Sequence, residues 1–160
     1  MQPAPDPIPS GQGLHLRRLH DLTEFEVADD NPDVRGWAVR GADGRRFGQV
    51  FELIVDVDAL KVRYLDIELD EALGLSERDR HILLPIGVAA LDEDADNVFV
   101  PSLTYESVTH YPPYAEIQIS REYEQAMLRA LNLPLPAAEP DFYNQPGYDG
   151  STFYQRRRLH

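Results

Sequence analysis

Alternation of apolar and polar residues between Val34 and Leu103 is the feature that most constrains the fold of this chain. A period of two places successive side chains on opposite faces of an extended strand, so that one face can be buried while the other meets water. Five or six short strands of this kind, joined by tight turns, predict a small antiparallel barrel or sandwich. We expect its core to include Phe51, Leu53, Val55, Leu65, Ile67 and Leu69.

Turn residues divide this region into its strands. Gly41-Ala42-Asp43-Gly44 predicts a hairpin, because glycine accepts a positive φ at no steric cost, and Asp58-Ala59 predicts a second turn. Residues 81–91 predict a strand that bends at Pro85. Proline cannot donate to a central ladder, so Pro101 predicts an edge position for the last strand of the region.

The segment Ser120–Leu131 predicts an amphipathic helix. Ser120 is a suitable N-cap, and Glu122 and Glu124 place negative charge near the positive end of the helix dipole. The apolar stripe at helical spacing consists of Tyr123, Met127, Leu128 and Leu131. Thr104 is expected to cap a second, shorter helix.

The chain has 160 residues, which indicates about one domain, and we divide it into four parts. Residues 1–13 are rich in proline and glycine and predict a flexible arm. Residues 14–33 are expected to form a leader that packs on the barrel, and residues 34–112 the barrel itself. Residues 113–160 are expected to hold the helix and an aromatic tail.

The tail contains more aromatic residues than a disordered segment usually does, so we expect it to be ordered. We predict that it forms the interface of a homodimer, and the alternative is that it packs against its own barrel. The basic run Arg156–Arg158 would favour approach to an acidic surface in either case. The candidate interface residues are Phe142, Tyr143, Tyr148, Phe153 and Tyr154.

Charge and composition exclude several classes of partner. Lysine and arginine number 15 against 28 aspartates and glutamates, for a net charge of −13. Affinity for phosphate comes mainly from lysine and arginine, so neither nucleic acid nor an anionic membrane surface is an expected partner. No stretch approaches the roughly 20 apolar residues of a spanning helix. We therefore expect a cytoplasmic protein without membrane insertion, whose protein partner the sequence does not name.

No complete set of catalytic or metal-binding residues is present in the sequence. Asp92, Asp94 and Asp96 have the opening spacing of a calcium loop, but Asn97 and Leu103 stand where that loop needs glycine and glutamate. The remaining candidates do not form ligand pairs at helical spacing: His15, His20, His81 and His110. With no cysteine in the chain, we expect no enzyme activity, no metal and no cofactor; a small hydrolase or metal enzyme is the alternative.

Five segments carry a family likeness: Asp33–Trp37, Gly44–Val50, Leu53–Asp56, Val62–Asp66 and His81–Gly87. Together they resemble the PRC-barrel domain. The likeness covers about residues 33–112, and the family includes the barrel of the photosynthetic reaction centre H subunit, the ribosome maturation factor RimM and many stand-alone bacterial proteins.

The resemblance implies a non-catalytic barrel that docks onto other proteins, as a scaffold or a regulatory module. One alternative is a soluble relative of the H subunit that assists a membrane electron-transfer complex. In that subunit the carboxylate after the Tyr-Leu step lies near the path of proton delivery to the quinone, and Asp66 occupies that place here. The other interpretation of Asp66 is an outward strand carboxylate. A RimM-like ribosome assembly factor is a further alternative, although 33 leading residues leave no room for its preceding domain.

Overall fold

The computed structural model describes residues 16–19, 33–92, 95–115, 119–133, 143, 148 and 153. Several sequence predictions therefore lie outside the described residues. They concern the arm at 1–13, most of the leader, Asp94, Phe142, Tyr154 and Arg156–Arg158.

The described residues form a single β-sheet with a helix on one side, which confirms the prediction of a mainly β fold. The strand order is β5-β4-β3-β2-β7-β6, and β1 pairs with the C-terminal part of β3 beside β2. The strands are β1 (Leu16–Arg18), β2 (Ala38–Gly41), β3 (Arg46–Asp56), β4 (Lys61–Leu69), β5 (His81–Pro85), β6 (Ala90–Asp92) and β7 (Asn97–Val100). The helical elements are η2 (Glu71–Leu73), η3 (Glu77–Asp79), η4 (Ile86–Val88), η5 (Ser107–His110) and α1 (Arg121–Ala130).

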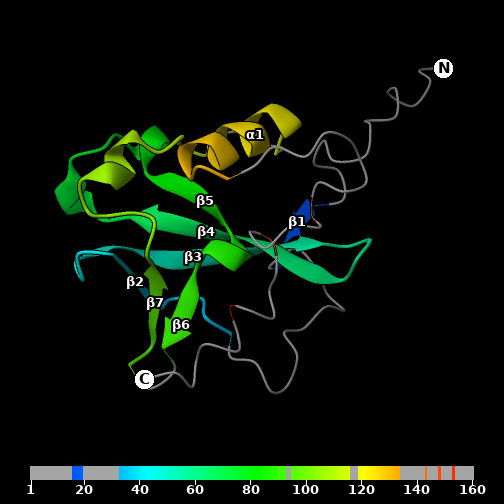
Figure 1. Cartoon of the computed structure of the whole chain (residues 1–160), viewed down its shortest axis with the longest axis horizontal. Helices are drawn as coiled ribbons and strands as arrows, with labels where there is room; N and C mark the ends of the chain where they lie inside the picture. The colour runs from blue at the N-terminus through cyan, green and yellow to red at the C-terminus, as the bar shows by residue number, and fades with distance from the viewer. Residues whose placement is uncertain are drawn as a thin grey trace.

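The sheet curls toward a barrel but is not closed. Within the described residues its two ends, β5 and β6, do not pair with each other, and in Figure 1 β6 and β7 run crosswise to β3, β4 and β5. The prediction of a wholly antiparallel barrel is wrong for one pair, because β2 and β7 run parallel. The edge position predicted from Pro101 is also wrong, since the strand that precedes this proline lies between β2 and β6.

A bulge in β3 reverses the expected direction of Phe51. Val50 pairs with Ile67 and Glu52 with Asp66, which leaves Phe51 as an extra residue without a partner on β4. The Phe51 side chain is 47% exposed, so the prediction that it lies in the core is wrong. The other five predicted core residues are buried: Leu53, Val55, Leu65, Ile67 and Leu69.

Tyrosines cover the outer edge of β5. The hydroxyl of Tyr111 donates to the carbonyl of Leu83 at 2.6 Å, and the hydroxyl of Tyr123 accepts from the amide of Leu83 at 3.4 Å. The amide of Tyr114 donates to the carbonyl of His81 at 2.7 Å. Backbone groups that would face water or another strand therefore bond to the segment that leads into α1 and to α1 itself, which protects the edge.

Helix α1 forms where the sequence predicts it. The Oγ of Ser120 accepts from the amide of Tyr123 at 3.1 Å and caps the helix. Tyr123, Met127, Leu128 and Leu131 are all buried, as the apolar stripe predicts. Figure 1 shows α1 lying over the β5 side of the sheet. No helix among the described residues is long and apolar enough to cross a membrane.

Candidate functional site

Asp66 lies in the middle of the face shared by β3, β4 and β5. It is opposite Glu52 of β3 and Leu83 of β5, and residues directly opposite each other in antiparallel strands point to the same side. Asp66 is only 3% exposed. It is therefore not the solvated strand carboxylate of one interpretation, and its burial requires hydrogen-bonding partners.

His81 is the partner of Asp66. The Nδ1 of His81 lies 2.8 Å from Oδ1 of Asp66, and the histidine side chain remains about one quarter exposed. Burial raises the pKa of Asp66, and the hydrogen bond that His81 donates to Asp66 raises the pKa of His81. Both shifts have the same direction, so the folded pair holds its protons more tightly than the separate groups would.

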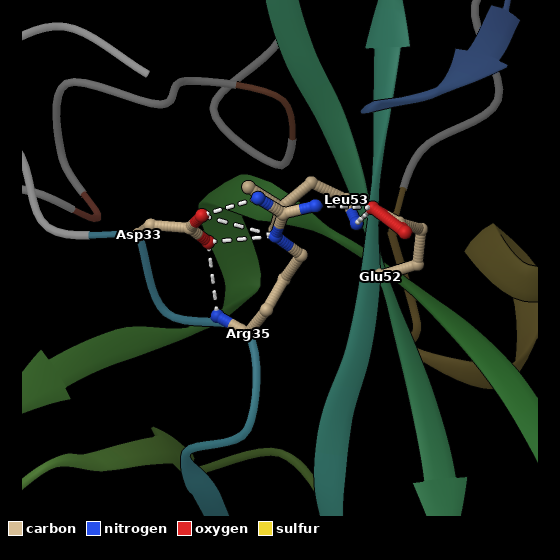
Figure 2. Close-up of polar contacts among 4 residues, drawn as sticks. All are labelled: Asp33, Arg35, Glu52 and Leu53. Atoms are coloured by element: carbon tan, nitrogen blue, oxygen red, sulfur yellow. Dashed lines mark hydrogen bonds and ion pairs between the residues drawn. The ribbon is translucent and has the colours of Figure 1, made fainter. Parts of the chain in front are cut away.

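Glu52 is a second buried carboxylate beside Asp66, and Arg35 compensates its charge. The Oε1 of Glu52 accepts from the amide of Leu53 at 3.2 Å and lies 3.4 Å from an Arg35 guanidinium nitrogen. Figure 2 shows the Arg35 side chain between Glu52 and Asp33. Hydrogen bonds from Arg35 hold the pKa of Asp33 below its usual value. The loop before β2 thus supplies the cation that this face of the sheet needs.

Phe51 lies next to His81 at the surface of this group. Its ring meets the His81 ring edge to face, with centroids 4.9 Å apart and planes at 89°. The bulge turns the Phe51 side chain outward, and almost half of its surface meets solvent. The site therefore combines an exposed aromatic ring, two buried carboxylates and a histidine. The histidine contacts the Phe51 ring and bonds to Asp66. We call the Phe51, Glu52, Asp66 and His81 group the Phe51–Asp66 site.

A second polar cluster closes the other half of the same face. Tyr64, two residues before Asp66 on β4, donates its hydroxyl to Oε2 of Glu124 on α1 at 2.5 Å. Tyr143 donates to the same oxygen at 2.6 Å, and the hydroxyls of Tyr64 and Tyr148 lie 2.7 Å apart. Burial raises the pKa of Tyr64 and of Tyr148, so these hydroxyls remain protonated donors. The described residues of helix and tail thus cover the Tyr64 end, whereas Phe51 at the other end is almost half exposed.

The described tail residues lie against the core of their own chain. Tyr148 and Phe153 are 2% and 0% exposed, and Tyr143 is partly buried, with the Arg63 guanidinium 4.7 Å from its ring centroid. This placement is the alternative that the sequence left open for the aromatic tail. The homodimer stays a prediction.

The sequence singled out Asp66 but not its partners. Glu52 and His81 are 14 and 15 residues away, and only the strand register brings them together. Among the described residues, no three histidine, aspartate or glutamate side chains gather in a way that could hold a metal ion. The groups present can bind a proton and offer an apolar contact.

The fold and the comparison with protein families agree. The family model of the PRC-barrel domain matches residues 26–104, which include β2 to β7 and the whole Phe51–Asp66 site. A domain of this family is in general a non-catalytic module. The family match contains the segments that carry the sequence resemblance, from Asp33–Trp37 to His81–Gly87, and it shows that residues 26–104 of this chain are a PRC-barrel domain.

Proposed function

We propose that this protein is a non-catalytic docking module that binds a partner protein through the Phe51–Asp66 site. The observation that carries the proposal is the outward position of Phe51, an aromatic side chain 47% exposed on a bulged strand. Aromatic residues with exposed surface are frequent anchors of protein interfaces, because they bury a large area with few rotatable bonds.

The site is also well prepared for binding. The Phe51 ring rests on His81, and His81 is fixed by Asp66 at 2.8 Å. A side chain that is already held loses less conformational entropy when a partner covers it. The Tyr64 end of the same face is occupied by Glu124 of α1, whereas at the other end the Phe51 side chain is 47% exposed.

Site-specific photo-crosslinking in cells of the source organism tests the proposal. A photoreactive phenylalanine analogue replaces Phe51 in one variant and Phe99 in the control, since Phe99 is also exposed (36%) but lies on β7. We expect a covalent adduct of defined mass from position 51 and none from position 99. An adduct from position 99 alone would place docking elsewhere, and adducts from neither position would contradict the proposal.

A substitution gives the second measurement. Phe51→Ala removes the exposed ring, and we expect the affinity for the crosslinked partner to fall by about tenfold or more, as for an interface anchor. Thermal unfolding should change little, because the ring is not part of the core. The identity of the crosslinked protein separates the alternatives from the sequence: a membrane electron-transfer complex favours the first, and a ribosomal protein favours the second.

A further inference from the structure

His81 connects a buried charge to the exposed surface. Its imidazole bonds to Asp66 on the inner side and contacts Phe51 on the outer side. Its backbone is held in place, because His81 pairs with Glu68 on β4 and its carbonyl accepts from the amide of Tyr114. Any response to a change of charge must therefore come from the side chain and from the ring that rests on it.

From this geometry we propose that the Asp66–His81 pair is a proton-controlled switch that sets the position of Phe51. The inference rests on the proposed function, in that it names the regulation of the same docking site. With the pair protonated, the imidazolium is held by the Asp66 carboxylate and supports the Phe51 ring. With the proton lost, the support weakens and the ring becomes free to move.

The charges that face the pair explain why its proton matters. Among the described residues, Glu52, Glu68, Arg18 and Arg80 act on Asp66 or His81 directly. Arg35 and its partner Asp33 join this group through Glu52. Four carboxylates and three guanidinium groups leave one negative charge, which a protonated His81 balances. When His81 is neutral, Asp66 remains buried beside Glu52 with weaker compensation, and a buried charge of this kind is costly.

The direction of the pH effect follows from both shifts. Burial raises the pKa of Asp66, and the bond to Asp66 raises the pKa of His81, so the folded chain binds more protons than the unfolded chain. A raised pKa stabilises the folded state below the ordinary value of the group, and this stabilisation is lost as the pH rises through the folded value. For His81 this loss of stabilisation begins above about pH 6.5, the ordinary pKa of histidine. The Phe51 ring should be held at a pH below this range, where His81 is protonated, and become mobile at a pH above it.

Nuclear magnetic resonance on the full chain tests the switch without any partner. The Cε1–H signal of His81 reports its titration, and the ring signals of Phe51 report the response. We expect both to shift with one common midpoint above about 6.5, the ordinary histidine value. A Phe51 ring whose signals do not follow the His81 titration would overturn the proposal.

Two substitutions make the assignment sharper. Asp66→Asn should lower the His81 midpoint toward its ordinary value, whereas Glu68→Gln, which removes a more exposed carboxylate on the same strand, should lower it less. Equal effects would contradict the assigned pair. If Asp66→Asn does not fold, His81→Gln at the partly exposed position serves instead, and the Phe51 signals should then lose their pH dependence in this range.

The crosslinking experiment separates this inference from the proposed function. When it is repeated with the crosslinked partner and the full chain in buffer, the adduct yield at position 51 should fall several-fold between about pH 6 and about pH 9, the range in which histidine titrates. A constant yield would reject the switch and keep the docking site. A Phe51 ring that follows His81 without any adduct would keep the switch and reject the docking site.

Discussion

At the scale of single residues, Leu60 and Leu65 show how strongly burial determines the contribution of a leucine to stability. Leu65 on β4 is fully buried, whereas Leu60 in the turn before β4 is 68% exposed. Leu65→Ala should lower the free energy of unfolding by about 2–5 kcal/mol, because it leaves a cavity in the core. Leu60→Ala is the matched control and should change it by no more than about 0.5 kcal/mol. Denaturant unfolding measures the free energy of unfolding of both variants. Similar losses would contradict the burial of Leu65 and the exposure of Leu60.

Glu122 and Glu124 offer a second matched pair in the first turn of α1. The sequence predicts the same dipole interaction for both, but Glu124 is fully buried and accepts hydroxyl hydrogen bonds, while Glu122 is exposed. Glu124→Gln keeps the shape and removes the charged acceptor, so we expect a loss of about 1–3 kcal/mol. Glu122→Gln should cost only a few tenths, the size of a dipole effect. Thermal or denaturant unfolding compares them, and an equal loss would contradict the buried network.

The sequence placed Phe51 wrongly and did not reveal the partners of Glu124 and Asp66, and these three cases share a physical cause. Val50 and Phe51 are both apolar neighbours on β3, so the alternation fits either one as the core residue, and the bulge selects Val50. Glu124 fits an exposed helix position by its charge, and the hydroxyls of Tyr64 and Tyr143, together with the Arg121 guanidinium 3.4 Å away, compensate its burial. Asp66 was recognised through resemblance, but its link to His81 depends on register. Contacts between distant segments decided each case.

At the scale of elements, the bulge of β3 leads to a prediction about deletions. Val50 and Glu52 already point to opposite faces, so deletion of Phe51 leaves the alternation of the remaining strand intact. The variant should keep cooperative thermal unfolding. Deletion of Leu53, by contrast, shifts every later residue of β3 to the other face and should abolish it. Circular dichroism follows both variants, and loss of the fold in the Phe51 deletion would contradict the role of this residue as an insertion.

Local patterns predicted the elements better than their arrangement. The hairpin at Gly41–Gly44 and the helix α1 depend on neighbouring residues, and both are confirmed. The strand predicted over residues 81–91 is divided by η4 into β5 and β6, which lie at opposite ends of the sheet. The parallel pairing of β2 with β7 joins residues almost 60 positions apart. A single sequence contains no local signal for a contact of that range.

At the scale of the whole molecule, removal of the tail tests how much the C-terminal segment contributes to the stability of the fold. Truncation after Asn132 removes Tyr148 and Phe153, which are buried in the core cluster. We expect the truncated chain to unfold at a much lower temperature, because Phe153→Ala alone should cost about 3–5 kcal/mol. Differential scanning calorimetry compares the two chains. A truncated chain as stable as the full one would show that the tail adds nothing to the fold.

Sedimentation of the same two chains tests the predicted homodimer. A dimeric full-length chain with a folded, monomeric truncation would assign the interface to the tail. A full-length chain that is monomeric at tens of micromolar would contradict the dimer. Since Tyr148 and Phe153 are already covered within one chain, a tail interface would have to use other residues, and Tyr143 retains some exposed surface.

The tyrosine cover of β5 has a consequence for how this fold can change in evolution. A strand closes a sheet only at a fixed length and register, whereas this cover meets β5 at three separate points. They are the hydroxyls of Tyr111 and Tyr123 on Leu83 and the amide of Tyr114 on the carbonyl of His81. The chain between these points can lengthen at small entropic cost, since doubling a flexible loop costs only about 0.6 kcal/mol. An added segment, or a whole inserted domain, between two of these points would therefore disturb the sheet little.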